Sequence, residues 1–173
     1  MIRTRTKAAI AGALILVAGS TATAGAGTAG TMRAAMNSFG EVPLTLSTPG
    51  TGTFQATANR ATDRIRYTLR FSQMSARVTQ AHIHLGRPAI AGGISVWLCD
   101  SAANPGPAGT PACPARRGTV QSVITRADVI GPTTQGMRAG AFNALMRAVN
   151  NNATYVNVHT TAFPSGEIRG PIH

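Results

Sequence analysis

The sequence predicts an all-β fold, in which short antiparallel strands form a sandwich or a barrel with one short connecting helix. Three observations support this fold class. Gly (19 residues) and Pro (10 residues) are frequent, and these residues mark turns between short elements. Short segments of alternating hydrophobic and polar residues recur along the chain, as in strands with one buried face. Hydrophobic residues make up 43% and charged residues 12% of the 173 residues, which provides enough apolar surface for the core of one domain.

The strand signals occur at regular intervals after a turn signal at Pro49 and Gly50. The clearest segment, residues 64–71, alternates polar and hydrophobic residues, which predicts an amphipathic strand. Its arginines form a basic strand face, expected in solvent, that consists of Arg64, Arg66 and Arg70. The full set of expected strands is 51–57, 64–71, 80–85, 94–99, 119–124, 154–160 and 167–172. Many short strands separated by Gly and Pro are typical of sandwiches and barrels.

One segment, residues 139–149, has helical rather than strand periodicity. Phe142, Leu145, Met146 and Val149 recur there at the spacing of one helix face. Three asparagines follow, where the chain can turn. The segment is therefore predicted to be the connecting helix.

The N-terminal residues have the layout of a secretory signal peptide. Arg3, Arg5 and Lys7 precede an apolar run at residues 8–18, and small residues follow as candidate cleavage sites. The apolar run is shorter than the roughly 18 residues needed to cross a bilayer. We therefore expect a secreted or periplasmic protein with no membrane span. The expected organisation is a cleaved signal peptide at residues 1–26, a flexible arm at 27–36 and a folded domain at 37–173.

The chain carries a high positive charge, which is compatible with several classes of anionic partner. The formal net charge is +11, and cleavage of the signal peptide removes three positive charges and lowers it to +8. Such a balance favours phosphate-bearing polymers, anionic envelope surfaces or nucleic acid. The basic strand face carries no interleaved aromatic residue, which disfavours single-stranded nucleic acid. The basic strand face is expected to be a solvated face without ligand, and an envelope or extracellular polymer or protein as partner is the alternative.

The two cysteines, Cys99 and Cys113, flank a segment rich in Pro and Gly. In a chain with an export signal, this arrangement predicts a disulfide, which stabilises such a loop by about 3 kcal/mol. The spacing matches neither a C-x-x-C motif nor a zinc knuckle, which disfavours a redox pair or a metal–thiolate site.

The histidines are the candidates for chemistry. Alternation along residues 81–85 puts His82 and His84 on one strand face and the aliphatic residues on the other. His159 takes the polar face of residues 154–160 in the same way. If these strands are neighbours in one sheet, three imidazoles point the same way and form a site for copper or zinc. Structural histidines bonded to polar neighbours are the alternative.

Two charged residues near the C-terminus are expected beside these histidines. Residues 164–166 (Pro-Ser-Gly) are a turn signal, so the segments on either side are predicted to pair as an antiparallel hairpin. Glu167 and Arg169 then share a strand face next to His159. Glu167 is expected to accept a proton from an imidazole nitrogen and so to orient a metal ligand. The alternative is a half-buried charge network that fixes the strand register.

Several blocks of the sequence resemble the CHRD domain, a module named after chordin. Residues 81–86 (AHIHLG) and 155–170 (with YVNVHT and FPSGEIRG) resemble its signature blocks, and residues 41–43 with 51–53 its opening block. The resemblance implies an antiparallel Greek-key β-sandwich, immunoglobulin-like or superoxide-dismutase-like, as in animal chordin and small exported bacterial proteins. It implies no established activity for the bacterial members. The segment 99–113 departs from the family pattern.

Residues 82–86 (HIHLG) also resemble the copper-binding segment of copper/zinc superoxide dismutases. Those enzymes need further histidines and a zinc loop rich in histidine and aspartate, whereas this chain has no histidine between residues 86 and 153, which disfavours dismutase activity.

The chain has five scattered acidic residues and neither a G-x-S-x-G nor an H-E-x-x-H motif, which disfavours hydrolases.

The function expected from the sequence is therefore that of an exported CHRD-type interaction module that is not an enzyme. A copper or zinc site is expected at His82, His84 and His159. Two alternatives are left open. One is a metal-dependent redox enzyme, which needs an open coordination position on a redox metal. The other is a structural envelope protein that holds an anionic polymer on the basic strand face, with binding that weakens as salt is added.

Overall fold

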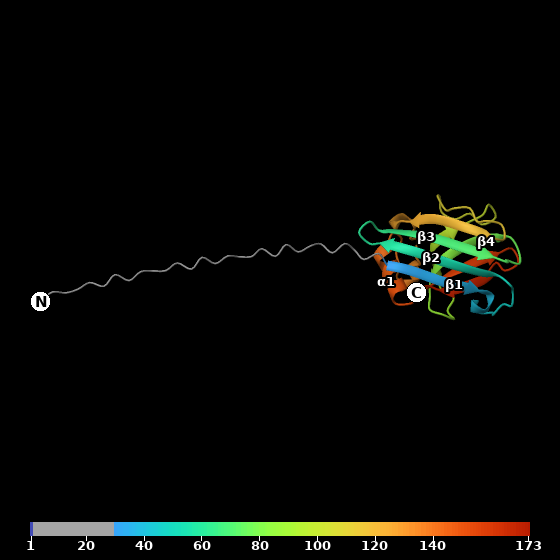
Figure 1. Ribbon diagram of the computed structural model, residues 1–173, viewed down its shortest axis with the longest axis horizontal. Coiled ribbons are helices and arrows are strands. Elements are labelled where there is room, and N and C mark those ends of the chain that lie inside the picture. Colours follow the sequence, from blue (N-terminus) through green and yellow to red (C-terminus); the bar gives the residue numbers. More distant parts are fainter. Residues whose placement is uncertain (2–29) are drawn as a thin grey trace.

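The computed structural model describes Met1 and residues 30–173 (Figure 1). Among these residues, the strands are β1 (Gly30–Asn37), β2 (Thr51–Asn59), β3 (Arg64–Ser72), β4 (Val78–Leu85), β5 (Gly93–Cys99), β6 (Gly118–Ile124), β7 (Thr154–Thr160) and β8 (Ile168–Pro171). The helical elements are α1 (Phe142–Asn150) and the short 3-10 turns η1 (Ser38–Gly40), η2 (Arg126–Asp128) and η3 (Thr133–Gln135). The predicted all-β fold with one short connecting helix is confirmed.

The strands form one antiparallel sheet in the order β5-β4-β7-β8-β1-β2-β3-β6. The sheet curls so far that its edge strands, β5 and β6, approach each other. The join between β8 and β1 is narrow: Asn37 pairs with Arg169, and Arg33 exchanges backbone hydrogen bonds with His173. The sheet therefore acts as two four-stranded halves packed face to face. We call β1, β2, β3 and β6 the front half, which faces the viewer in Figure 1, and β5, β4, β7 and β8 the back half.

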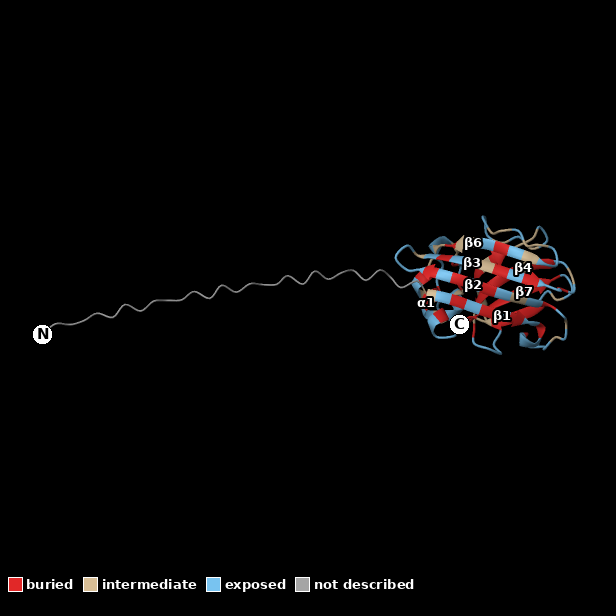
Figure 2. Cartoon of the chain, in the orientation of Figure 1, coloured by how far each residue is buried: buried red, intermediate tan, exposed pale blue. Residues whose placement is uncertain are grey.

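The hydrophobic core lies between the two halves. Along the strands of the front half, buried and exposed residues alternate, as Figure 2 shows. Phe54 and Leu69 of the front half and Val96 of the back half are fully buried in this core. Tyr67 of β3 reaches β5 and donates a hydrogen bond of 2.6 Å to the Leu98 carbonyl. The core is thus held by apolar packing, and the hydrogen bond of Tyr67 joins the two halves across it.

The predicted strands correspond to β2 through β8, with ends that differ by at most two residues. The predicted turn at residues 164–166 joins β7 and β8 as an antiparallel hairpin. The predicted helix 139–149 begins later than expected, at Phe142, because Ala141 takes the N-cap position. The four residues predicted for its buried face, Phe142, Leu145, Met146 and Val149, are all buried. This helix lies at one end of the sheet (Figure 1).

The prediction of a flexible arm at residues 27–36 is wrong from residue 30 onward. Residues 30–37 form β1, which pairs with β2 along its whole length, from Gly30 opposite Ala58 to Asn37 opposite Thr51. β1 buries Met32 and two further residues by strand alternation. The small side chains of this segment carry a weak hydrophobic signal, and the pairing with β2 supplies the order that the local sequence does not. The signal peptide predicted at 1–26 lies outside the described residues, apart from Met1, as do residues 27–29 of the arm.

The predicted disulfide between Cys99 and Cys113 is present and closes the loop that follows β5. No helix in the described residues is long and apolar enough to cross a membrane.

Candidate metal centre

The strands that carry the three histidines are neighbours in the back half. β4 and β7 pair antiparallel, with Ala81 opposite Val158, and both of these residues lie in the hydrophobic core. Because side chains alternate along a strand, His82 and His84 of β4 and His159 of β7 lie on the outer face of this half. The condition on which the three-histidine prediction depended is therefore met.

This part of the outer face is closed off from water. His82 has no exposed surface, and His84 and His159 expose 8% and 6% of theirs. Two loops cover the rings: the loop before β5 reaches His84 with the carbonyl of Gly92, and the turn before β8 reaches His159 with the carbonyl of Pro164. The histidines thus belong to a second, polar buried layer on the other side of the sheet from the hydrophobic core.

The three imidazoles converge. One ring nitrogen from each lies within 4.8 Å of those from the other two. His82 Nδ1 and His159 Nε2 are 3.2 Å apart, close to the roughly 3.4 Å that separates two nitrogens bound at about 2.0–2.1 Å with tetrahedral angles. Within residues 30–173, this is the sole group of three His, Cys, Asp or Glu side chains with such an arrangement.

Backbone carbonyls fix the protonation of two rings. The Nδ1 atoms of His84 and His159 lie 2.9 Å from the carbonyl oxygens of Gly92 and Pro164 respectively. Since a carbonyl oxygen only accepts, both Nδ1 atoms carry the hydrogen and both Nε2 atoms present a lone pair. His82 then donates from Nδ1 to His159 Nε2. The Nε2 atoms of His82 and His84 are buried and have no hydrogen-bond partner within the described part of the chain.

Burial keeps the rings neutral. Loss of contact with water lowers the pKa of His82 to about 2, and repulsion from His159 and His84 adds to this effect. Burial likewise lowers the pKa of His84 to about 4, against the opposing hydrogen bond with Gly92. The pKa of His159 is also lowered by burial. Neutral imidazole is the form that binds metal ions, so the three rings are in their metal-binding form at neutral pH.

Aromatic side chains frame the histidines. The Tyr155 ring stacks on the His84 imidazole, with centroids 4.7 Å apart. The guanidinium carbon of Arg169 lies over the Tyr155 ring, 3.4 Å from its centroid. Trp97 of β5 pairs with His82 in the strand register and meets its ring edge-on, with centroids 4.3 Å apart. Tyr155 and Trp97 therefore hold the imidazoles of His84 and His82 in place.

Glu41 is a buried acidic residue of this layer that the sequence reasoning did not mark as functional. It is 4% exposed, and its carboxylate accepts a hydrogen bond of 2.6 Å from Asn157. Burial raises the pKa of Glu41 to about 7, while the positive charge of Arg169 lowers it. Gly166, at a φ of +132°, packs so closely on Glu41 and Asn157 that a Cβ has no room. The one sequence signal for Glu41 is its place in the opening block of the family resemblance.

The prediction that Glu167 orients an imidazole is wrong. Its carboxylate accepts hydrogen bonds of 2.8 Å from the Ser75 backbone N–H and from the Thr160 hydroxyl. The Pro164 carbonyl takes the place expected for it at His159 Nδ1. A backbone carbonyl of the turn can do this because the turn folds back over the histidine strand. Glu167 instead ties the hairpin to the segment after β3.

Arg169 lies in the polar layer, but it is not paired with Glu167. Besides covering Tyr155, it donates hydrogen bonds to the carbonyls of Arg87 and Ile90, at 3.2 and 2.7 Å. Both acceptors belong to the loop that leads to Gly92. Arg169 therefore holds the loop whose carbonyl orients His84.

The remaining predicted sites lie apart from the histidines. The basic strand face of Arg64, Arg66 and Arg70 is exposed on β3, in the front half. The disulfide lies after β5 and provides no free thiol, since both cysteines are consumed in it.

The comparisons with known proteins give one family. No curated protein and no solved structure matches the chain. The CHRD domain model matches residues 32–172, a range that includes β2 to β8, all three converging histidines and both cysteines. The chain therefore belongs to the CHRD domain family.

Proposed function

We propose that this protein is an exported interaction module that binds one copper or zinc ion through His82, His84 and His159. The observation that carries the proposal is the convergence of three buried, neutral imidazoles, two of which have their Nδ1–H bound by backbone carbonyls. Histidine ligands in metal sites have this arrangement: one nitrogen donates to a carbonyl or carboxylate, and the other faces the ion.

A purely structural role accounts for less of this geometry. Buried polar atoms in folded proteins are almost always hydrogen-bonded, and each one left without a partner costs about 1–3 kcal/mol. The Nε2 atoms of His82 and His84 have no partner in the described residues. A metal ion bound between the rings would satisfy the Nε2 atom of His84, which the protein itself leaves unpaired.

Little rearrangement is needed to close the three nitrogens around an ion. His82 and His159 already present nitrogens 3.2 Å apart, and the full set, within 4.8 Å, closes with ring movements of about 1 Å. The ion would replace the hydrogen bond between His82 and His159. If His82 binds through Nδ1, its hydrogen moves to Nε2 and no proton leaves the site.

The single tryptophan of the chain provides the test. Trp97 contacts His82 edge-on, so Cu²⁺ bound there is expected to quench its fluorescence and to saturate at one equivalent. Zn²⁺ is expected to compete for the same site without comparable quenching. Metal content after exhaustive dialysis, measured by mass spectrometry, gives the stoichiometry. Folded protein that retains neither ion would refute the proposal.

Two variants make this test specific. His84→Gln removes one ligand while keeping a polar side chain, and it is expected to weaken binding by at least tenfold, on the order of the effect of losing a ligand or its support. His173→Ala changes an exposed histidine outside the cluster and is expected to leave binding unchanged. Circular dichroism of both variants shows whether a loss of binding is a loss of fold.

Export is supported by the disulfide, since disulfides persist in oxidising compartments, and by the pattern of the N-terminal residues. N-terminal sequencing of the protein recovered outside the cytoplasm is expected to begin at or near residue 27. An intact N-terminus on that protein would contradict cleavage.

We propose binding rather than catalysis. The three ligands are 0%, 8% and 6% exposed, so a substrate would have to displace the loops at Gly92 and Pro164 to reach the ion. The redox alternative predicts that the copper-loaded protein consumes superoxide at a rate that follows copper occupancy. We expect a rate no higher than that of the copper-treated His84→Gln variant.

A further inference from the structure

The exposed face of the front half carries arginines without acidic partners. Arg33 of β1 and Arg66 and Arg70 of β3 point outward, whereas none of the four strands contains Asp or Glu. Within the described residues the single ion pair joins Arg126 to Asp63, outside these strands. The positive charge of this face is therefore not neutralised by the protein.

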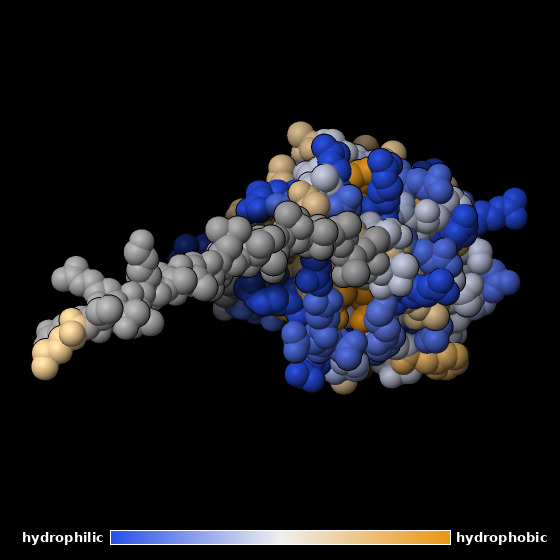
Figure 3. Space-filling view, turned by 60° about the vertical axis from the view of Figure 1, so that its left-hand side comes forward, coloured by the Kyte–Doolittle hydropathy of each residue, from blue (hydrophilic) through white to orange (hydrophobic). Residues whose placement is uncertain are grey.

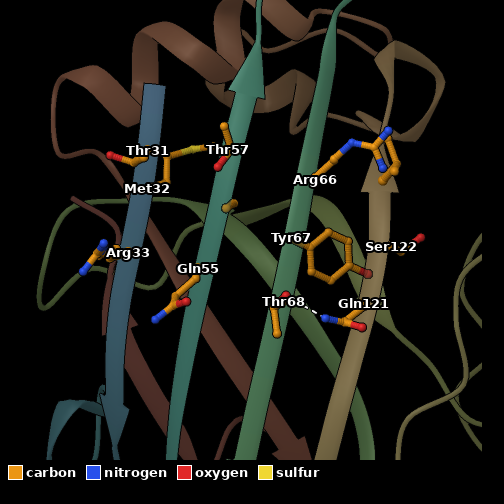
Figure 4. Close-up of a pocket in the computed structure, with 12 residues that line it drawn as sticks. Thr31, Met32, Arg33, Gln55, Thr57, Arg66, Tyr67, Thr68, Gln121 and Ser122 are labelled. Carbon is orange, nitrogen blue, oxygen red and sulfur yellow. Dashed lines mark hydrogen bonds between the residues drawn. The ribbon is translucent and has the colours of Figure 1, made fainter. Parts of the chain in front are cut away.

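Strand register arranges the outward side chains in rows across the four strands. One row, drawn in Figure 4, consists of Arg33, Gln55, Thr68 and Gln121. Gln121 donates a hydrogen bond to Thr68 within this row. The rows on either side consist of Thr31, Thr57, Arg66 and Val123, and of Ala35, Thr53, Arg70 and Thr119. Threonine, glutamine and arginine thus make up most of this surface.

Two shallow hollows follow one another along this face. The first, of about 580 Å³, has Arg33, Gln55, Arg66 and Gln121 in its lining. The second, of about 570 Å³, lies between Arg70 of β3 and Arg117, just before β6. On the side seen in Figure 3, most of the visible surface of the described residues is hydrophilic, and apolar areas lie between polar side chains. An extended chain laid across the face would meet guanidinium groups in both hollows.

We propose that this face binds an acidic polysaccharide, through Arg33, Arg66, Arg70 and Arg117. Guanidinium groups bind carboxylate and sulfate groups with paired hydrogen bonds. The threonine and glutamine side chains both donate and accept hydrogen bonds, as sugar hydroxyls do. The proposal does not depend on the metal site, which lies on the outer face of the back half.

The same face is poorly suited to other polyanions. Bases of single-stranded nucleic acid stack on exposed aromatic rings, but the aromatic residues of these strands, Phe54, Tyr67 and Phe71, are all buried. Insertion into a lipid surface uses exposed large hydrophobic side chains. Those of the described chain, such as Phe39, Leu44 and Ile90, lie outside these four strands.

The test is binding of the purified protein to dextran sulfate and polygalacturonate, with neutral dextran as the uncharged probe. We expect both acidic polymers to bind, with affinity falling at least about tenfold between 50 and 200 mM NaCl, since counterion release at two contacts alone gives about that factor. Neutral dextran is expected not to bind. Failure of both acidic polymers to bind would overturn the proposal.

Two triple variants with the same loss of charge separate this face from net charge. Arg33→Gln/Arg66→Gln/Arg70→Gln is expected to weaken binding at least about tenfold. The control changes three exposed arginines elsewhere, Arg87, Arg138 and Arg147, to Gln and is expected to leave binding within about twofold. Equal losses in the two variants would show attraction by net charge alone and would contradict the proposal.

Two further measurements complete the test. One shows whether the face prefers polysaccharide or nucleic acid, and the other shows whether polymer binding depends on the metal site. Single-stranded oligothymidylate of matched charge is expected to bind more weakly than dextran sulfate. Tighter binding of the oligonucleotide, lost in the Arg33→Gln/Arg66→Gln/Arg70→Gln variant, would assign the face to nucleic acid and overturn the proposal. The His84→Gln variant is expected to bind dextran sulfate like the wild type, so failure of the metal proposal leaves this one standing.

Discussion

Tyr155 stacks on the imidazole of His84 with ring planes 2° from parallel and centroids 4.7 Å apart. The two residues face each other across β7 and β4, so strand register alone brings them together. The Gly92 carbonyl holds the edge of the same imidazole, and its backbone N–H donates to the Tyr155 hydroxyl at 3.1 Å. Arg169 covers the tyrosine. The orientation of His84 is therefore set by the protein before any ion binds.

Removal of this stack is expected to weaken metal binding. Tyr155→Leu leaves the His84 ring without its flat support, and we expect about a 10–100-fold loss of copper and zinc affinity, as for other groups that orient metal ligands. Tyr155→Phe keeps the ring and loses the hydroxyl alone, so a much smaller loss is expected. Competition with a chelator of known affinity measures both. An unchanged affinity in Tyr155→Leu would show that the stack does not position His84.

Because of the close packing at Gly166, substitution of this residue is expected to destabilise the fold. Its φ of +132° disfavours other residues, and a Cβ would meet the Asn157 amide and the Glu41 carboxylate. Gly166→Ala is therefore expected to lower the free energy of unfolding by about 2–4 kcal/mol. The control is Gly136→Ala, at a φ of +84° with open space around the added methyl group, where strain alone costs about 1 kcal/mol. Urea unfolding followed by tryptophan fluorescence compares the two, and equal losses would contradict the packing argument.

The disulfide is expected to contribute mainly by restricting the unfolded chain. The bridge links residues 14 positions apart, and a loop of this size corresponds to about 3 kcal/mol. Cys99→Ala/Cys113→Ala is expected to lose that amount while keeping the β-sheet spectrum. Since neither cysteine belongs to the histidine cluster, copper binding in the folded variant is expected to be unchanged. A variant that folds with wild-type stability would show that the bridge adds nothing beyond the native contacts of the loop.

The candidate ligands could be predicted from local sequence because alternation decides which face a side chain takes. His82, His84 and His159 sit opposite aliphatic residues in their own strands, so their shared face follows once the strands are neighbours. The pairing itself depends on contacts between distant parts of the chain, which alternation does not specify. β1 was missed for the same reason: its order comes from the ladder with β2.

The groups that support the ligands were out of reach of sequence reasoning. The partners of His84 and His159 are backbone carbonyls of Gly92 and Pro164. Every residue has a backbone carbonyl, so the residue type does not indicate which carbonyl accepts the hydrogen bond. Glu41 meets Asn157 across 116 positions of sequence. Charge made Glu167 the obvious candidate for a partner of an imidazole, but loop geometry placed a neutral oxygen there instead.

Acid is expected to destabilise the metal-free protein from about pH 6.5 downward. The folded-state pKa of His82 is about 2 and that of His84 about 4, both below the ordinary value of 6.5. Between each folded-state value and 6.5, the unfolded chain binds protons that the folded chain does not. The free energy of unfolding therefore decreases as the pH is lowered. The two histidines together lose about 4 kcal/mol from pH 7 to pH 5, and proton uptake by Glu41 offsets about 2 kcal/mol of this. Because the lowered pKa of His159 adds to the loss, we expect a net loss of at least about 2 kcal/mol, measured by urea unfolding in the presence of EDTA. Stability that rises over this range would contradict the burial of neutral histidines.

Over the same pH range, Glu41 is expected to change the free energy of unfolding in the opposite direction from the histidines. Its pKa is about 7 in the folded protein and 4.5 ordinarily, so between these values the folded chain binds the extra proton and stability falls as the pH rises. Glu41→Gln mimics the protonated carboxyl and retains an oxygen that accepts from Asn157. The variant is therefore expected to lose about 2 kcal/mol more than the wild type from pH 7 to pH 5. The steeper loss appears because the compensating proton uptake is gone, whereas parallel profiles for wild type and variant would show that Glu41 titrates alike in both states.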